Sequence, residues 1–223
     1  MSQDLFQILL KGTGETLYMV SICSVIAIIL GIPLGILLVV SEKGGIFPLV
    51  KTNKIIGFII NIIRSMPEII LIIVVLPLSK IIIGTTLGSN AAIIPISIGC
   101  APLVSRIVEN SLKEVDYGKV EAAQSMGATT FQIILKVLLP EALPSIVRGI
   151  TISIIGVIGF SAIAGSIGAG GLGSLAIRYG YQRFRTDVLV STVLILIIIV
   201  QGIQLLGDLL AKHKNKKRYK LDK

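Results

Sequence analysis

Residues 16–40 read TLYMVSICSVIAIILGIPLGILLVV and contain no charged side chain. A helix of about 20 mainly apolar residues is long enough to cross the roughly 30 Å hydrocarbon core of a bilayer. Polar and apolar residues do not alternate here, as they do in a strand of a membrane β-barrel. The stretch therefore predicts a transmembrane α-helix.

The rest of the chain repeats this pattern. Its mean hydropathy is +0.92 and only 15% of its 223 residues are charged, against about 25% in a soluble domain. The length allows one domain, so we expect an all-α integral membrane protein whose single membrane domain covers residues 1–223. The five predicted spans are about 16–40, 55–78, 91–108, 146–167 and 188–210.

Positive charge predicts the orientation, because loops rich in lysine and arginine stay in the cytoplasm. Five spans place the two ends of the chain on opposite sides. With the C-terminus in the cytoplasm and the N-terminus outside, the inner segments carry fifteen basic residues: Lys43, Lys51, Lys54, Arg106, Lys113, Lys119, Lys136, Arg148, Lys212, Lys214, Lys216, Lys217, Arg218, Lys220 and Lys223. The outer segments carry five: Lys11, Lys80, Arg178, Arg183 and Arg185.

The two ends of the chain and its cysteines can be interpreted without a signal peptide, a nucleic acid or a metal ion. Asp4 precedes the first basic residue and the first apolar run is long, so we expect an uncleaved first span. The basic tail, residues 211–223, is predicted to meet anionic lipid, and no nucleic acid is expected. Cys23 and Cys100 fall within spans, away from the single histidine, His213, so no metal site is predicted.

The longest aqueous segment, about residues 109–144, contains the sequence EAAQSMGATTFQIILKVLLPEALPSI at 121–146. Residues 119–126 favour a helix, and Gly127 can end it with a positive φ. Thr129 and Gln132 have the spacing of a capping box. The following helix, 131–139, is predicted to be limited by prolines at 140 and 144.

The first helix and its turn carry little bulk, so another surface can approach their backbone. Beside the small residues stand two apolar anchors and one acid. The candidate contact residues are Glu121, Ala122, Ala123, Met126, Gly127, Ala128 and Phe131. From the residues alone, the segment is either a docking element for a soluble partner or an amphipathic connector on the membrane.

The segment resembles the signature loop of ABC importer permeases: E-A-A, then glycine four residues after the second alanine, then an apolar stretch ending in L-P. Those elements stand here as Glu121, Ala122, Ala123, Gly127 and Leu139–Pro140. The resemblance implies a coupling helix between spans 3 and 4 that docks in a cleft of a cytoplasmic ATPase. ATP and Mg²⁺ then belong to that partner, and this chain is neither an enzyme nor the carrier of a cofactor.

Four further stretches resemble the methionine-import permeases of this superfamily: FIINIIRSMP (58–67), VENSLKEV (108–115), KVLLPEALPSIV (136–147) and SIGAGGLGSLAIRYGY (166–181). That likeness implies a permease subunit for D- or L-methionine, or a related amino acid, in a bacterial cytoplasmic membrane. It implies as partners a second permease, an ATPase dimer and an extracytoplasmic binding lipoprotein.

Arg64 and Glu68 are unusual charges within a predicted span. Four residues apart, they would share one face of a helix, and Pro67 between them can loosen it. The end of this span either lines the pathway or begins later, with both charges among lipid headgroups. Glu68 stands where the family pattern leads us to expect an apolar residue.

The motif GAGGLG, 168–173, fits a dinucleotide fingerprint by letter but not by context, because a membrane span precedes it. We expect a glycine-rich outer loop, either flexible or closely packed at the outer mouth. The pathway candidates are Arg64, Ser161, Gly168, Gly170, Gly171 and Gly173.

Other functions stay open as alternatives. An ion-driven secondary transporter would need ionisable groups in the membrane, for which only Glu68 is a candidate. A non-transporting scaffold, or an ABC permease for another small solute, is also compatible with the composition. The chain lacks a nucleotide-binding G-x-x-x-x-G-K-[ST] loop and therefore cannot hydrolyse ATP.

Overall fold

The computed structural model describes residues 2–221, and the side chains of residues 5–212; the side chains of the predicted basic tail after Lys212 lie outside this part. The described residues form helices and no strand, in agreement with an all-α protein. The α-helices are α1 (Ser2–Val40), α2 (Val50–Ser65), α3 (Glu68–Ile83), α4 (Ser89–Lys113), α5 (Tyr117–Ser125), α6 (Thr130–Ile133), α7 (Leu139–Ala164), α8 (Gly171–Leu175) and α9 (Thr186–Leu221). Three π-helical segments join them: η1 (Ile134–Leu138), η2 (Gly165–Ala169) and η3 (Ala176–Tyr181).

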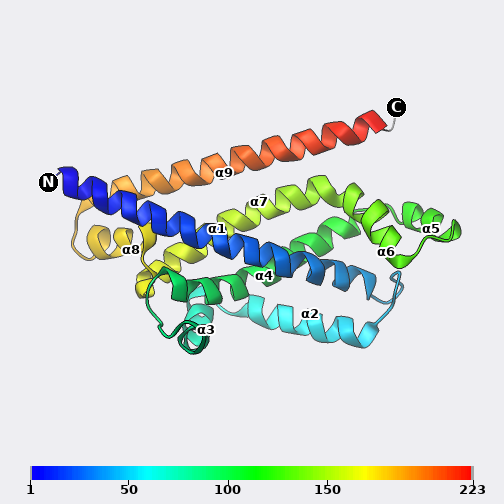
Figure 1. The fold of residues 1–223 in the computed structure, drawn as a ribbon, viewed down its shortest axis with the longest axis horizontal. Helices are drawn as coiled ribbons and strands as arrows, with labels where there is room; N and C mark the ends of the chain where they lie inside the picture. The colour runs from blue at the N-terminus through cyan, green and yellow to red at the C-terminus, as the bar shows by residue number, and fades with distance from the viewer. Residues whose placement is uncertain (1, 222–223) are drawn as a thin grey trace.

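The helices α1, α4 and α7 run along the long axis and form the centre of the molecule, with α9 along one side (Figure 1). Helix α1 packs on α4 most closely at two glycines. A Cβ added to Gly31 would lie 2.6 Å from Val104, and one added to Gly35 would lie 2.6 Å from the Ser105 carbonyl oxygen. Small residues thus bring two membrane helices into backbone contact, as they commonly do in bilayers.

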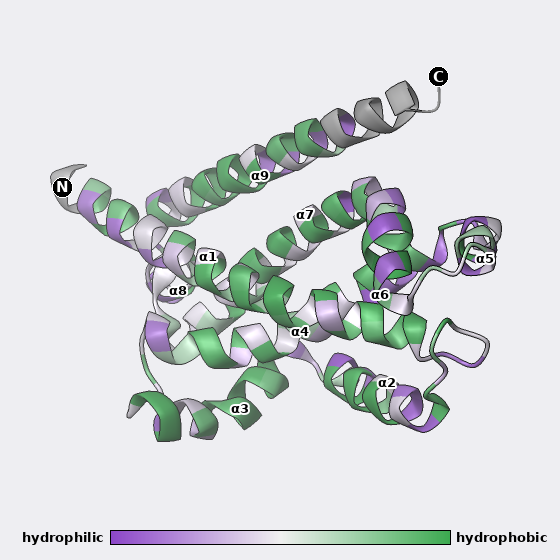
Figure 2. Ribbon diagram, turned by 45° about the vertical axis from the view of Figure 1, so that its right-hand side comes forward, coloured by the Kyte–Doolittle hydropathy of each residue, from purple (hydrophilic) through white to green (hydrophobic). Residues whose placement is uncertain are grey.

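The long helices are largely hydrophobic, whereas α5 and the turns beside it form a polar end (Figure 2). Hydrophilic residues also occur near the start of α1 and around α8. Four described stretches are long and apolar enough to cross a membrane: Leu5–Val40, Ser89–Lys113, Thr130–Ala169 and Thr186–Lys212. The α2–α3 pair makes a fifth if it counts as one span.

That pair differs from the prediction for residues 55–78. We expected one helix, but α2 and α3 meet at a bend of 111°. The backbone is extended at Met66 (φ −78°, ψ 133°) and Pro67 (φ −55°, ψ 136°). Proline disfavours a helical conformation in the residue before it and has no N–H to continue the helical hydrogen bonds, so the helix ends rather than loosens.

The expectation that Pro140 and Pro144 limit the helix after Thr129 is wrong. The chain stays helical from Thr130 through η1 and α7 to Ser166, and non-helical φ/ψ angles begin at Ile167. Pro140 therefore lies inside a continuous helical stretch, in the first turn of α7. The π segment η1 precedes it, and the Leu139 N–H reaches back five residues to the Ile134 carbonyl. Ala142 and Ile146 are buried on either side of Pro144, so packing holds that turn.

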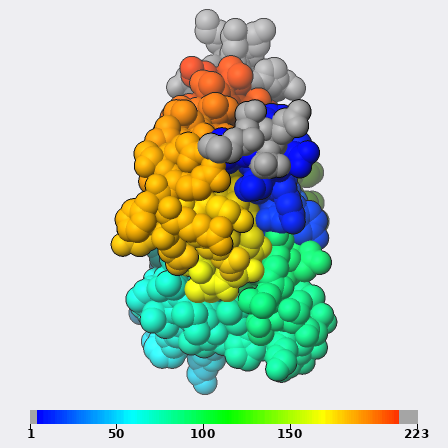
Figure 3. All heavy atoms as spheres, turned by 90° about the vertical axis from the view of Figure 1, so that its left-hand side faces the viewer, coloured from blue at the N-terminus to red at the C-terminus, as the bar shows by residue number. Residues whose placement is uncertain are grey.

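The glycine-rich segment is packed rather than flexible. Gly171 and Gly173 are buried, and a Cβ added to Gly173 would lie 2.4 Å from the backbone of Ala162 in α7. Figure 3 views this end of the molecule, where the yellow and orange residues lie beside the blue start of α1. Close backbone packing therefore closes the end of the bundle opposite α5.

Candidate functional site

We call residues 117–138 (α5, α6 and η1) the coupling segment, after the role that the resemblance implies. Its first helix, α5, is bounded at both ends by specific hydrogen bonds. The Asp116 side chain accepts a hydrogen bond from the Gly118 N–H at 2.8 Å. At the other end Gly127 has φ +78°, and the Ala128 N–H donates to the Ala123 carbonyl at 3.0 Å. The predicted helix and its glycine turn are confirmed, with the start moved back to Tyr117.

The predicted capping box opens the next helix. The Gln132 N–H donates to Thr129 Oγ1 at 3.3 Å, and the Thr129 N–H donates to Gln132 Oε1 at 2.9 Å. Both side chains satisfy backbone groups that the first helical turn leaves free. The direction in which the chain leaves Gly127 is therefore fixed locally.

The coupling segment presents an apolar surface at the polar end of the molecule. The side chains of Met126 and Phe131 are 81% and 69% exposed. Glu121, Ala122 and Pro140 are also exposed, whereas Ala128 is half-buried and Ala123 is buried. Nothing lies within 4 Å of a Cβ added to Gly127. Large apolar side chains exposed at a polar end of this kind suit contact with a partner surface.

The reverse face of α5 is anchored to the body. Val120 and Ala123 belong to the buried core together with Ile133 and Leu138. Lys119 Nζ lies 2.8 Å from Glu141 Oε1, so an ion pair joins α5 to α7. One ion pair and packed side chains therefore connect α5 to the body of the molecule and to α7.

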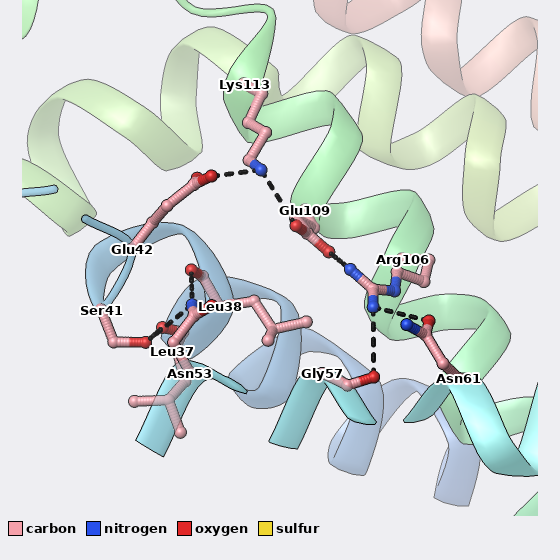
Figure 4. Close-up of polar contacts among 10 residues, drawn as sticks. All are labelled: Leu37, Leu38, Ser41, Glu42, Asn53, Gly57, Asn61, Arg106, Glu109 and Lys113. Carbon is pink, nitrogen blue, oxygen red and sulfur yellow. Dashed lines mark hydrogen bonds and ion pairs between the residues drawn. The ribbon is translucent and has the colours of Figure 1, made fainter. Parts of the chain in front are cut away.

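A charged network lies at the same end of the molecule, between α4 and the connection from α1 to α2 (Figure 4). The Glu109 side chain is only 9% exposed and lies 2.6 Å from Arg106 Nη1 and 3.1 Å from Lys113 Nζ. Lys113 Nζ also lies 2.9 Å from Glu42 Oε2, just beyond the end of α1. We call these four residues, Glu42, Arg106, Glu109 and Lys113, the charged network.

Hydrogen bonds extend the charged network to α2. Arg106 Nη2 donates to Asn61 Oδ1 at 2.8 Å and to the Gly57 carbonyl at 3.4 Å (Figure 4). Asn53 donates to the Leu38 carbonyl at 2.6 Å, which ties α2 to α1. The first half of the broken span is thereby fastened to α4, four residues before α5 begins.

Sequence reasoning missed this network. It counted Arg106 and Lys113 only as positive charge inside, and Glu109 only as a loop residue. The available signal was the spacing at 106, 109 and 113, which places three charges on one helix face. The partners on α1 and α2 are distant in sequence and could not be assigned from spacing.

The predicted pathway residues are not brought together. The bend separates Arg64 from Glu68, so they do not share a helix face, and Arg64 is exposed. Ser161 is buried and donates to the Ile158 carbonyl of its own helix at 2.8 Å. The roles of both residues in a pathway stay predictions.

The predicted glycines lie in the glycine-rich segment, residues 165–181 (η2, α8 and η3), where it meets α1 and the residues around the start of α4. The Gly171 N–H donates to Glu15 Oε2 at 2.7 Å, and the Leu172 N–H donates to Thr16 Oγ1 at 2.8 Å. A Cβ added to Gly170 would lie 2.6 Å from Glu15, and one added to Gly168 2.7 Å from Leu87. These positions need glycine for packing and for positive φ.

Cys23 and Cys100 are both buried free thiols. Among the described residues, no group of three or more histidine, cysteine, aspartate or glutamate side chains could hold a metal ion.

Comparison with known proteins identifies relatives along most of the chain. The family described as "Binding-protein-dependent transport system inner membrane component" matches residues 27–218. The probable D-methionine transport system permease protein of Vibrio cholerae is 47% identical over 206 residues, which is 92% of each chain. The methionine import system permease protein of Bacillus subtilis is 46% identical over 207 residues, 93% of each chain.

Two solved structures share the fold. An inward-facing conformation of the MetNI methionine ABC transporter contains a chain that matches with a TM-score of 0.93 at 41% identity, covering 96% of this chain and 99% of the other. An amino acid ABC transporter with histidines matches with a TM-score of 0.78 at 19% identity, over 95% of this chain and 96% of the other, and so shares the fold alone.

Proposed function

The chain belongs to the binding-protein-dependent transport system inner membrane components, and from this premise we propose that it carries methionine, as the L- or D-enantiomer or a close analogue. It is a multi-pass membrane permease of an ABC importer. The single observation that most supports methionine is the TM-score of 0.93 to the MetNI chain, over 96% of this sequence. The relatives from two distant bacteria carry methionine in their names as well.

The proposed assembly has two copies of this chain, two ATPase subunits in the cytosol and a binding protein on the outer side. ATP and Mg²⁺ bind to the ATPases. The N-terminus then lies outside and the C-terminus inside, as the distribution of positive charge favours. The opposite placement of the chain ends along the long axis in Figure 1 agrees with an odd number of crossings.

We further propose that α5 is the element by which the ATPase moves the permease. Glu121, Ala122, Met126, Gly127, Ala128 and Phe131 contact the ATPase, whereas the buried Ala123 holds α5 against the body, and Pro140 starts α7. Closure of the ATPases shifts α5, and the Lys119–Glu141 pair and the core beneath Val120 pass the shift to α7. Helix α4 follows because it ends four residues before α5.

The test compares two leucine substitutions in the complete importer, reconstituted in proteoliposomes with ATP inside. Gly127→Leu places bulk on the contact surface at φ +78°. Gly44→Leu is the matched control, because Gly44 has φ +86° and also has nothing within 4 Å of an added Cβ. Each costs about 1–2 kcal/mol in backbone strain, but only the first blocks close approach of a partner.

We expect Gly127→Leu to reduce ATP-dependent methionine uptake to background and to weaken copurification of the ATPase, with Gly44→Leu near wild type. Equal uptake by the two variants would remove the docking role from α5. Uptake that persists when ATP is omitted but a sodium or proton gradient is present would favour a secondary transporter instead.

A further inference from the structure

An apolar cavity, open on one side, lies between α3, α7, the glycine-rich segment and α9. It has a volume of about 690 Å³, within the range of roughly 300–1,000 Å³ of small-molecule sites. Its walls include Ile69, Ala162, Ile163, Ile177 and Leu196, and Glu68 is the one charged residue among the described lining.

The cavity lies toward the end of the molecule opposite α5. Ala162 and Ile163 stand in the last turn of α7, and Gly173 belongs to the glycine-rich segment, whose Gly171 N–H donates to Glu15 just before the predicted first span. Glu68 therefore lies beside an apolar wall in the half of the bundle away from α5.

Glu68 has no hydrogen-bond or ion-pair partner among the described residues. It is exposed to the open side of the cavity in the isolated chain, and the bend at Pro67 takes Arg64 off its helix face. The carboxylate is therefore available to accept a hydrogen bond from a ligand. Ser166, the polar neighbour in the wall, already donates its hydroxyl to the Ile163 carbonyl at 2.6 Å.

One structural role for Glu68 is evident. It occupies the first turn of α3, where a negative charge stabilises the helix dipole by about 0.3–1 kcal/mol. Pro67, not Glu68, occupies the N-cap position. The dipole interaction needs no hydrogen bond, so the carboxylate oxygens of Glu68 remain available to a ligand.

We propose that this cavity is a transient binding site for the transported solute, a zwitterionic α-amino acid with an unbranched apolar side chain. The ammonium group lies at the Glu68 carboxylate, and the side chain lies along Ile69, Ala162, Ile177 and Leu196. This inference rests on the proposed function. An acid without a partner, set in an apolar wall, complements a cation attached to an apolar chain and offers nothing to a neutral lipid tail.

The experiment uses the complete importer in proteoliposomes, with ATP inside and saturating binding protein outside. Uptake of radiolabelled L-methionine and ATP hydrolysis stimulated by the binding protein are both measured. Glu68→Gln keeps the size and removes the charge; Glu68→Asp keeps the charge. Glu114→Gln is the matched control, an exposed acid of the inner segment that does not line the cavity.

We expect Glu68→Gln to lower the initial uptake rate about tenfold, in line with the loss of one hydrogen bond to a charged group. Stimulated hydrolysis stays within about twofold of wild type because α5 is untouched. Glu68→Asp keeps at least about half of the uptake, and Glu114→Gln leaves it unchanged. Equal uptake by Glu68→Gln and wild type overturns the inference and leaves the cavity to lipid or to a second copy of the chain.

Two outcomes separate this inference from the proposed function. If wild type moves another amino acid but not methionine, the proposed cargo is wrong, and the same variants are assayed with the amino acid that is transported. If Glu68→Gln does not assemble with the ATPase, the Ile69→Trp variant is assayed in its place. This substitution fills the cavity and keeps the Glu68 carboxylate. Loss of uptake with intact stimulated hydrolysis supports the site, and wild-type uptake overturns it.

Discussion

Glu109 is a carboxylate buried between two cations near the end of α4. Its oxygens lie 2.6 Å from Arg106 Nη1 and 3.1 Å from Lys113 Nζ. Arg106 and Lys113 are 22% and 41% exposed at their side chains, so water screens part of the interaction. The acid nevertheless neutralises two positive charges that otherwise face each other across one helix face.

Glu109→Ala is expected to destabilise the permease by about 1–3 kcal/mol. Removing one partner of a fully buried pair costs about 3–5 kcal/mol, and the exposure of the two cations lowers that figure. At roughly 2–4 °C per kcal/mol for a chain of this size, the thermal midpoint in detergent falls by about 2–12 °C. The control Glu114→Ala, on the exposed side of the same segment, stays within about 1 °C, and an equal midpoint for both would show that the network contributes nothing to stability.

Among the helices, the broken second span directs α2 and α3 to different parts of the molecule. Helix α2 is fastened to α4 by Arg106, Asn61 and Gly57. Helix α3 turns away by 111° and carries Glu68 into the apolar cavity.

Spin labels at Ile55 and Ile81 measure this bend directly. Both positions are exposed, and the native cysteines are buried. A straight helix would place the labels about 39 Å apart, from 26 residues at 1.5 Å each. Arms of about 16 and 20 Å that meet at the observed bend of 111° leave about 20 Å between the labelled positions.

Helix α4 provides the control distance for that measurement. Labels at the exposed Asn90 and Asn110 should lie about 30 Å apart, at 1.5 Å per residue. A 55–81 distance longer than the 90–110 distance would mean that the two helices form one continuous span.

At the scale of the whole molecule, the coupling segment and the glycine-rich segment lie at opposite ends (Figure 1). The end with α5 also contains the connection from α1 to α2 and the last turns of α9. The other end contains the start of α1 and the segment around α8. If the long axis crosses the bilayer, these two ends face different compartments.

Cysteines introduced at Gln124 and Gln182 test the orientation. Both are exposed glutamines, one in α5 and one after η3. Since Cys23 and Cys100 are buried, a membrane-impermeant maleimide should react only at the new positions. We expect labelling of Gln182→Cys in intact spheroplasts and of Gln124→Cys only after permeabilisation; the reverse pattern would invert the proposed topology.

Much of the local structure was predictable because local interactions set it. The helix of α5, the positive φ of Gly127 and the Thr129–Gln132 capping box follow from side-chain chemistry within a few residues. The continuity through Pro140 was not predictable in the same way, because it depends on a π turn and on core packing of Ala142 and Ile146. The lining of the apolar cavity could not be predicted, because helices distant in sequence build it.

Hydropathy and helix capping were enough to predict an all-helical membrane protein and the turn between α5 and α6, because both act on short stretches of chain. The pairing of Lys113 with Glu42, the contact of Arg106 with Asn61 and the apolar cavity beside Glu68 depend on how distant helices pack. A charge or a cavity wall acts over a few ångströms in space, whereas these residues are separated in sequence by up to 128 positions, as Glu68 and Leu196 are.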